Sequence, residues 1–371
     1  MSVSINGTGG ITFADASTQN TGGYTGFRNR IINGAMMMGQ RNAGASVTPS
    51  AATITYTLDR WQVYQTSASK FSVQQNAGSV TLPVGFTNYL GVTSLAATTP
   101  GATDEYMIRQ FIEGYNVSDL AWGSSSAKTI TLSFQVYSSL TGTFGGSIQN
   151  SAANRCYVFS YTISVANTWT SVSVTIPGDV TGTWLTTNEI GLRLIFDIGG
   201  GTSKKGTAGS WSSSEYDGVT GGTNVIGTNG ATFYITGVQL EKGSVATPFE
   251  YRPYGTELAL CQRYFQKSYD IGTAVGTATR TGMVSWNWQN LSNYGTVFIQ
   301  LPVRMRAAPT STNYNPDLSN TVGGRYWNGT SEVAFTGSMN GWSNYESSIT
   351  FNKDATSSTN MLIQWTASAE L

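Results

Sequence analysis

The sequence contains no histidine, little charge and only two cysteines in 371 residues. Without histidine, Ser-His-Asp catalysis, Cys-His catalysis and imidazole metal ligation are all excluded. Charged residues make up 11% of the chain, well below the ~25% of an ordinary globular protein. The 20 acidic and 20 basic residues cancel and form no block of one sign, so we expect neither nucleic acid nor an anionic membrane as a partner.

Long hydrophobic runs and targeting signals are also missing. No apolar stretch approaches the ~18 residues of a membrane-spanning helix, so we expect no membrane insertion. The first residues, MSVSINGTGG, lack the basic and apolar regions of a signal peptide, and we therefore expect synthesis in a cytoplasm without secretion. Cys156 lies in a strand-like pattern and Cys261 in a helix-like one. Two cysteines are too few for a disulfide framework, and we predict buried free thiols.

Glycine and aromatic residues, in contrast, are abundant. The chain has 43 glycines, 19 tyrosines, 15 phenylalanines and 10 tryptophans, a composition typical of strands and turns. In residues 130–136, isoleucine, leucine, phenylalanine and valine alternate with polar residues, which places one face of a strand in a core and the other toward solvent. We predict further strands at 106–113, 156–163, 169–176, 190–198 and 232–240. The sequence therefore predicts an all-β fold.

The length predicts two domains, because 371 residues exceed the usual size of one hydrophobic core. Residues 1–45 are predicted to form an N-terminal oligomerisation arm, with a loose tail as the alternative for residues 1–26, and residues 46–254 a jelly-roll β-sandwich of roughly eight or more strands. Residues 255–268 contain the best helical window and are predicted to be a hinge helix. Residues 269–371 form a second β-sandwich, with strands at 281–288, 296–302, 347–351 and 361–366 and a turn at Gly323-Gly324.

One segment of the chain carries a specific family resemblance. TGVQLEKGSVATPFEYRPYGTELALCQRYFQKS, residues 236–268, resembles the closing strand and hinge of a module found in tail-fibre proteins of tailed bacteriophages, including cyanophages. Four other segments resemble the same module in the same order: FRNRIINGAMMMGQRNAG at 27–44, YTLDRWQVY at 56–64, IRQFIEGYNVSDLAWGSSSAKTITLSFQVYSSLTGTF at 108–144 and ANTWTSVSVTIPGDVTGTW at 166–184. The chain departs from this pattern after about residue 268.

The resemblance implies a virion protein of the phage tail. Such modules are similar to the jelly-roll β-sandwich of carbohydrate-binding modules, so the resemblance also implies contact with polysaccharide on the host cell surface. A fibre of this kind is expected to be a homotrimer, bound to the baseplate or other tail proteins through its N-terminal arm. The C-terminal domain is then expected to bind the receptor.

Catalytic and metal sites are weakly indicated by the residues. Two carboxylates could serve glycoside hydrolysis. The eligible carboxylates are Asp104, Glu105, Glu189, Glu215 and Asp217. No spacing among them singles out a catalytic pair, and an exposed turn position is favoured for each, so we expect no enzyme. A structural calcium site, built from Asp197, Asp217 or Glu241 with loop carbonyls, stays open as an alternative, and no other cofactor is expected.

Aromatic residues in loops are the better indication of function, because an aromatic face stacks on the apolar face of a pyranose while amides and hydroxyls bind the sugar hydroxyls. The candidates among glycine, serine and asparagine are Trp211, Tyr216, Arg325, Tyr326, Trp327, Trp342 and Tyr345. For each of them, packing in a loop or a trimer seam is the alternative. Core packing is instead predicted for Trp61, Trp122, Trp169, Trp286, Trp288 and Trp365, which lie in strand patterns or at tight turns.

Two hypotheses of function follow. The first is a non-catalytic adhesin that recognises host glycan through the tip of a homo-oligomeric fibre. The second is a purely structural baseplate or fibre-connector protein without a host ligand.

Overall fold

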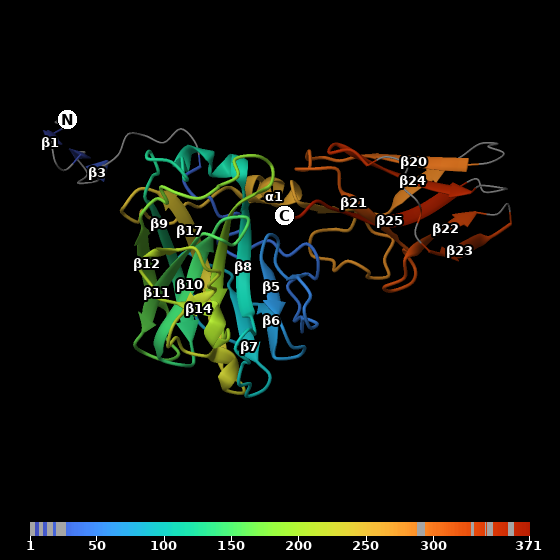
Figure 1. Ribbon diagram of the computed structural model, residues 1–371. Coiled ribbons are helices and arrows are strands. Elements are labelled where there is room, and N and C mark those ends of the chain that lie inside the picture. The colour runs from blue at the N-terminus through green and yellow to red at the C-terminus, as the bar shows by residue number, and fades with distance from the viewer. Residues whose placement is uncertain are drawn as a thin grey trace.

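The computed structural model describes residues 4–6, 10–12, 18–19, 27–287, 294–327, 330–337, 339, 344–354 and 360–371. Along the chain, a small N-terminal sheet is followed by a large β-sandwich, one α-helix and a second, smaller β-sandwich (Figure 1). The predicted all-β fold with two sandwich domains is therefore confirmed. In the described part of the chain, no helix is long and apolar enough to cross a membrane.

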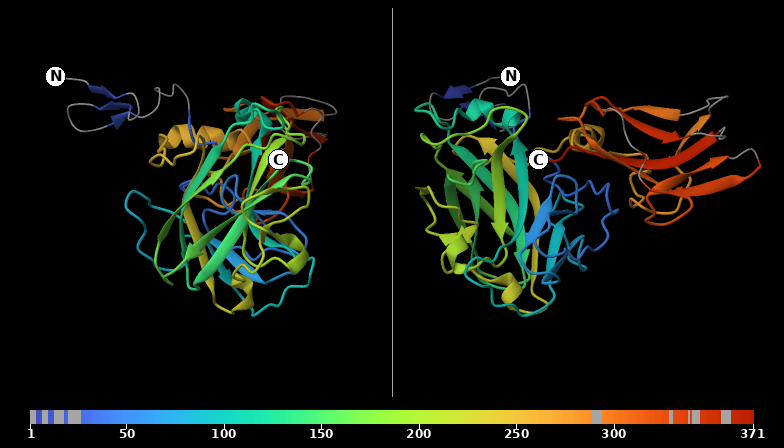
Figure 2. Two further views of the ribbon diagram at one scale, coloured as in Figure 1. Left: turned by 60° about the vertical axis from the view of Figure 1, so that its left-hand side comes forward. Right: turned by 45° about the vertical axis from the view of Figure 1, so that its right-hand side comes forward.

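The N-terminal sheet is antiparallel and has three short strands, β1 (Ser4–Asn6), β2 (Gly10–Thr12) and β3 (Thr18–Gln19). It lies apart from the large sandwich in Figure 1 and in the left view of Figure 2.

The large sandwich consists of two sheets. The strand order of the seven-stranded sheet is β15 (Trp211–Ser212), β11 (Cys156–Ile163), β10 (Gly142–Gln149), β13 (Ile190–Asp197), β8 (Tyr106–Glu113), β5 (Gln62–Gln65) and β4 (Thr55–Tyr56). The five-stranded sheet has the order β12 (Thr170–Ile176), β9 (Ile130–Ser138), β17 (Thr232–Lys242), β7 (Leu90–Ser94) and β6 (Phe71–Gln75). A short parallel pair, β14 (Lys205–Gly206) and β16 (Gly218–Val219), lies in the long connection after β13.

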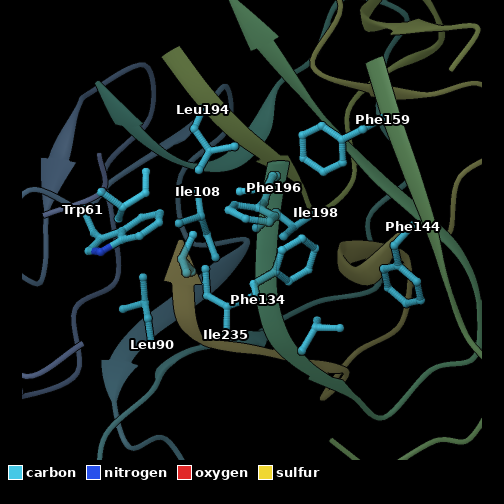
Figure 3. Packing of buried hydrophobic residues seen from close by; sticks show 14 of the residues in the cluster. Trp61, Leu90, Ile108, Phe134, Phe144, Phe159, Leu194, Phe196, Ile198 and Ile235 are labelled. Carbon is cyan, nitrogen blue, oxygen red and sulfur yellow. The ribbon is translucent and has the colours of Figure 1, made fainter. Parts of the chain in front are cut away.

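The core fills the space between these two sheets. Phe134 and Ile235 point inward from the five-stranded sheet and meet Ile108 and Phe196 from the seven-stranded sheet (Figure 3). Phe134 packs edge-on against Phe196, with 5.1 Å between ring centroids. The alternation predicted for residues 130–136 is confirmed, since the polar residues between the buried ones lie on the outer face of β9.

Strand β17 runs through the middle of the five-stranded sheet and carries a bulge. It pairs with β9 on one side and β7 on the other, and its register against β9 shifts between Thr236 and Gln239. Gly237 lies in this bulge with φ +61°, in the left-handed region that glycine adopts most easily. A bulge of this kind bends its strand locally.

Residues 27–45, which the sequence analysis assigns to the arm, pack against the large sandwich. Ile31 and Met36 are fully buried in its core. Arg30 N donates to Leu240 O at 2.8 Å and Val238 N donates to Gly34 O at 3.0 Å, so this segment runs beside the bulged part of β17. Apolar burial and these backbone hydrogen bonds together hold the segment on the sandwich.

Helix α1 (Tyr254–Gln262) leads into the second sandwich. One layer contains β18 (Phe265–Lys267), β19 (Val284–Asn287), β21 (Thr310–Tyr314), β22 (Gly323–Trp327), β23 (Glu332–Thr336) and the long β25 (Asn360–Ser368). The other layer is the antiparallel pair β20 (Tyr294–Gln300) and β24 (Ser348–Asp354). Val297, Phe351 and Ile363 pack between the layers.

Buried charged contacts join the two sandwiches. The side chain of Arg60 in the large sandwich is 1% exposed and pairs with Glu370 at the end of the chain, which also binds Arg41 at 2.8 Å. Arg263, just after α1, pairs with Glu113 of β8 at 2.5 Å. Because breaking a buried ion pair is strongly unfavourable, the second sandwich is held firmly on the first.

Two sequence predictions for the second sandwich are wrong. Gly323 and Gly324 begin strand β22 instead of forming a turn. A Cβ on Gly324 would lie 2.7 Å from Ile363 and 2.8 Å from Phe335, so glycine is needed here for close packing inside a sheet. Trp286, predicted to be core, is 40% exposed on the short strand β19, although its cross-strand neighbour Met361 is buried.

Other predictions about buried residues are confirmed. Trp61, Trp122 and Trp365 are buried, and Cys156 and Cys261 are buried free thiols. Burial raises the pKa of Cys156 to about 12, so this thiol is unreactive at neutral pH. Trp288 lies outside the described residues.

Candidate functional site

An open groove of about 430 Å³ lies on the outer face of the five-stranded sheet. One wall is aromatic and comes from two segments far apart in the sequence, Phe86 in the loop before β7 and Phe249 with Tyr251 in the chain after β17. The floor is polar and comes from β9 and β12. Every residue that lines the groove is neutral.

The wall is a packed cluster of three rings. Ring centroids lie 5.2 Å apart for Phe86 and Phe249, 5.6 Å for Phe86 and Tyr251, and 4.9 Å for Phe249 and Tyr251. A Cβ on Gly237 would lie 2.6 Å from the tip of the Phe86 ring, so the bulge of β17 makes the space that this ring occupies. Tyr251 is 54% exposed and Val84 beside it is fully exposed, which leaves an apolar surface open to a ligand.

The floor follows from the alternation of two paired strands. Gln135 of β9 lies opposite Ser171 of β12, and Ser133 lies opposite Ser173, so all four side chains share the outer face. Ser171 Oγ donates to Gln135 Oε1 at 2.9 Å, which orients the amide. Hydroxyl and amide groups on this floor can donate hydrogen bonds to, and accept them from, the hydroxyl groups of a ligand.

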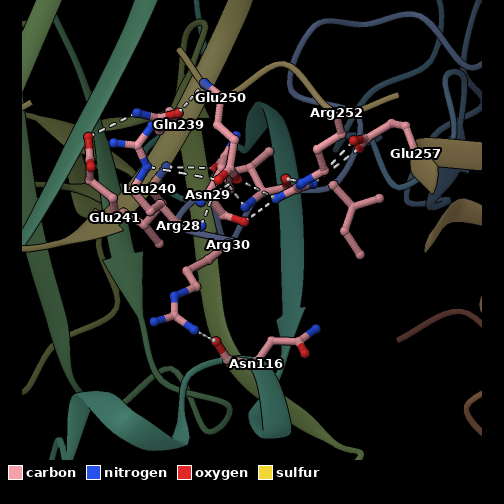
Figure 4. Close-up of polar contacts among 12 residues, drawn as sticks. Arg28, Asn29, Arg30, Asn116, Gln239, Leu240, Glu241, Glu250, Arg252 and Glu257 are labelled. Carbon is pink, nitrogen blue, oxygen red and sulfur yellow. Dashed lines mark hydrogen bonds and ion pairs between the residues drawn. The ribbon is translucent and has the colours of Figure 1, made fainter. Parts of the chain in front are cut away.

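A hydrogen-bond network fixes the chain that carries Phe249 and Tyr251 (Figure 4). Glu250, between them, accepts hydrogen bonds from the backbone N–H groups of Arg28 and Asn29, both at 3.0 Å. Its own N–H donates to Gln239 Oε1 at 2.8 Å. Arg252 then donates to Ile31 O at 3.1 Å and to Glu257 at the start of α1. The segment at 28–31 therefore anchors the aromatic wall.

A second set of contacts holds the start of the same chain. Glu241 of β17 is buried and accepts hydrogen bonds from the N–H of Thr247 and from its hydroxyl, both at 2.8 Å. Gln239 Nε2 donates to Glu241 at 2.9 Å. This carboxylate is thus engaged by protein groups, and it does not line the groove. The wall is preorganised by these contacts, which reduces the entropy lost on binding.

Two of the sequence-predicted candidates lie on the large sandwich, at the connection after β13. Trp211 packs edge-on against Trp122 and Trp184, with centroid distances of 5.3 and 5.6 Å, and its Nε1 donates to Pro177 O at 3.0 Å. Tyr216 packs against Val219 and a small apolar cluster with Cys156. Both side chains are held in packed clusters away from the groove.

The remaining candidates lie on the second sandwich and do not form one site. Arg325 and Trp327 point to one face of β22 and Tyr326 to the other, where it meets Phe335 at 6.3 Å. Tyr345 is 61% exposed and lines a separate open hollow of about 570 Å³ with Arg304 and Glu346. Trp342 lies outside the described residues.

The predicted carboxylates occupy several different environments. Lys204 pairs with both Glu105 and Glu215 at 2.7 Å, and Asp104 accepts a hydrogen bond from Gly101 N. Burial and the negative charges of Glu105 and Asp197 raise the pKa of Asp217 to about 8. Glu189 is exposed. Among the described residues, no three Asp, Glu or Cys side chains gather into a group that could hold a metal ion.

Sequence reasoning missed the residues of the groove. Phe249 and Tyr251 were visible only as aromatic residues between two prolines, Pro248 and Pro253, and nothing local relates them to Phe86 or to β9. Aromatic residues between two prolines, in the segment that follows a predicted strand, are the signal in the sequence.

Similarity to known proteins is found among solved structures. No family model matches the chain, and no curated protein matches it. Among solved structures, the enzymatically active domain of tailspike protein 4 from bacteriophage CBA120 is 15% identical, with a TM-score of 0.31, covering 58% of this chain and 21% of that one. The chain therefore spans about a fifth of that tailspike structure.

Two carbohydrate-binding modules are also similar. The family 11 module from Clostridium thermocellum, solved with a β-1,3-1,4-mixed-linked tetrasaccharide, is 13% identical over 54% of this chain and all of its own, with a TM-score of 0.26. The CBM22-1 xylan-binding domain from Paenibacillus barcinonensis is 9% identical over 55% of this chain and 99% of its own, with a TM-score of 0.25.

Proposed function

We propose that the protein is a tail-fibre protein of a bacteriophage that binds neutral host glycan in the groove of its large sandwich, without cleaving it. The observation that carries this proposal is the combination of the exposed, preorganised ring cluster at Phe86, Phe249 and Tyr251 with a floor of hydroxyl and amide groups. A pyranose presents an apolar face and a rim of hydroxyl groups, so it complements both surfaces at once.

Non-catalytic binding is supported by the lining of the groove. Glycoside hydrolysis needs two carboxyl groups that flank the sugar bond. The lining residues here are serine, glutamine, glycine, alanine, threonine, proline, valine, phenylalanine and tyrosine. The nearby carboxylates of Glu241 and Glu250 are occupied by backbone N–H groups of the protein.

The placement in a phage tail is supported by the sequence resemblance of the five segments between residues 27 and 268. Several of these segments build the site: residues 28–31 anchor the wall, β9 and β12 form the floor, and residues 236–251 contribute the bulge and two rings. In a homotrimer anchored to the tail by residues 1–26, three weak grooves would act together and raise the effective affinity without new contacts.

A structural connector without a ligand is the competing function. The second sandwich favours it, because its sequence-predicted aromatic residues are dispersed over different faces. The two functions differ in one measurable property, the binding of the intact protein to host cells or to purified glycan.

The test is a binding assay with full-length protein, its oligomeric state verified by light scattering. Neutral polysaccharides and host cells are the probes. Tyr251→Ala removes an exposed ring of the groove wall, and Tyr115→Ala removes a tyrosine that is 59% exposed on the short helix Gly114–Asn116, outside the groove. Tyr345→Ala removes an exposed tyrosine from the hollow of the second sandwich.

We expect Tyr251→Ala to weaken binding about tenfold, as for the loss of one stacking contact and its buried area, while Tyr115→Ala leaves binding unchanged. A loss confined to Tyr345→Ala would move recognition to the second sandwich. If wild-type protein binds neither cells nor any neutral polysaccharide, the connector function is the correct one.

A further inference from the structure

The outer face of the seven-stranded sheet carries two arginines that no carboxylate neutralises. Arg109 on β8 and Arg193 on β13 both point outward, on strands that are hydrogen-bonded neighbours. Within the described part of the chain, neither guanidinium has a carboxylate oxygen within 4.0 Å, whereas ten other arginines do.

Both arginines are held in place by contacts that leave their charge uncompensated. Phe111 lies opposite Arg193 in the register, and the guanidinium carbons of Arg109 and Arg193 lie 4.8 and 5.2 Å from the centre of its ring. Arg109 Nε donates to Gln62 Oε1 at 2.9 Å, and Arg193 Nη2 donates to Ser151 O. Arg193 Nε is buried and has no hydrogen-bond partner among the described residues.

The carboxyl groups that act electrostatically on the two arginines are Glu105, Glu215 and Asp217, and each is engaged by another cation or neutral. Asp197, on the same face of β13, pairs with Lys205. Glu105 and Glu215 both pair with Lys204 at 2.7 Å. Asp217 holds its proton at neutral pH, because burial raises its pKa to about 8. Burial and the positive charge of Arg193 lower the pKa of Arg109, which means that the two cations repel each other in a partly dehydrated place. Such a pair is stabilised by an external anion.

We propose that Arg109 and Arg193 form a binding site for an anionic group of a polysaccharide, a carboxylate or a phosphate, on the face opposite the neutral groove. The planar guanidinium groups match the paired oxygens of either anion, and the Phe111 ring between them holds their separation fixed. The site is independent of the groove, because the two lie on the outer faces of different sheets. Figure 1 shows β8 next to β5 in this sheet.

The test is native affinity electrophoresis of the full chain in gels that contain one of three polymers. Polygalacturonate offers carboxylates, sodium polyphosphate offers phosphates and dextran is neutral. The double variant Arg109→Gln/Arg193→Gln is compared with Arg304→Gln plus Arg280→Gln, which changes the net charge equally and removes exposed arginines that have carboxylate partners. Both single variants are run as well, so that a misfolded double variant does not end the experiment.

We expect at least one acidic polymer to retard the wild-type protein, with an apparent affinity about tenfold lower in the double variant and unchanged in the charge-matched control. The polymer that retards the protein shows whether the site binds a carboxylate or a phosphate. Retardation should weaken as sodium chloride rises from about 50 to about 500 mM, because exposed charges are screened.

Two results would overturn the proposal: no retardation by either acidic polymer, or an equal loss in the charge-matched control. A comparison of two ligands separates this site from the groove. The arginine variants should still bind neutral glycan, and the Tyr251→Ala variant should still be retarded by the acidic polymer.

Discussion

The two outer faces of the large sandwich share one core but differ sharply in chemistry. On the face of the five-stranded sheet, the groove is lined by neutral side chains, among them serine, glutamine and three aromatic rings. The face of the seven-stranded sheet carries Arg109 and Arg193 against the ring of Phe111, and Asp197 of β13 and Asp217 of the connection after it are buried. The alternation of side chains along a strand explains how one core can carry two different faces. Inward positions determine the fold, while outward positions are free to vary.

The faces also differ in how their side chains are fixed. On the neutral face, backbone N–H groups far apart in sequence donate to Glu250 and Glu241, which hold the aromatic wall from below. On the charged face, Lys204 is shared by two carboxylates, of which Glu215 is 42% exposed. Buried hydrogen bonds to a charged acceptor contribute more to stability than exposed ion pairs do. The neutral face should therefore be the more sensitive to loss of a carboxylate.

Replacing Glu250 tests this difference most strongly. Glu250→Ala leaves the N–H groups of Arg28 and Asn29 without their acceptor and removes one partner of Arg252, whose side chain is 4% exposed. We expect the free energy of unfolding, measured by urea denaturation, to fall by about 3 kcal/mol. Glu215→Ala on the charged face is the matched control, and it should change stability by less than about 0.5 kcal/mol. Similar losses in both variants would contradict the comparison.

Asp217 provides a pH-dependent test on the charged face. In the unfolded chain this carboxyl loses its proton near its ordinary value of 3.8, while in the folded protein burial, Glu105 and Asp197 raise its pKa to about 8. Between these values the folded state binds more protons, so the contribution of Asp217 to stability falls as pH rises and is fully lost above about pH 8.

Asp217→Asn should remove this pH dependence. We expect the variant to be more stable than the wild type at alkaline pH, by several kcal/mol, and to show no gain at acid pH, where the wild-type carboxyl is protonated. Thermal unfolding across the pH range measures the effect. A constant difference between the two proteins at every pH would show that Asp217 is ionised in the folded state.

Gly237 tests the geometry of the neutral face. Gly237→Ala places a Cβ at φ +61° and 2.6 Å from the Phe86 ring, so we expect a loss of about 2 kcal/mol and a displaced ring. In a Phe86→Ala background the clash is absent, and the same change should have a smaller effect. Urea denaturation of the four proteins in this double-mutant cycle measures the coupling, and additive effects would mean that the ring does not occupy the bulge.

The sequence predicts strands that are rich in large apolar residues better than strands that are rich in glycine. Residues 106–113 and 156–163 were predicted with the bounds that β8 and β11 have, because their apolar residues are large and frequent. Strand β10, with the sequence GTFGGSIQ, was not predicted. A Cβ on Gly145 would lie 2.8 Å from Val219 and one on Gly146 2.1 Å from Ile195 O, so these glycines reflect close tertiary packing that no local pattern reveals.

The groove was hidden from sequence reasoning for a similar reason. The alternation in residues 130–136 correctly placed Ser133 and Gln135 on an outer face, yet nothing in it identifies β12 as the partner strand. The aromatic wall joins Phe86 to Phe249, which are far apart in the sequence, and only tertiary structure brings them together. Local composition instead favoured glycine-flanked aromatic residues such as Trp211, which the structure packs against other rings.

The smallest predicted effect tests the floor of the groove. Gln135→Ala removes an outward amide that is oriented by Ser171, and Gln74→Ala removes an outward amide of β6, on the same face of the same sheet but outside the groove. We expect Gln135→Ala to lower the affinity for neutral glycan about fivefold, as for one hydrogen bond to a sugar hydroxyl, with an unchanged free energy of unfolding. Gln74→Ala should change neither quantity. Equal affinities for wild type and Gln135→Ala would confine recognition to the aromatic wall, and the neutral face would then bind its ligand by apolar stacking alone.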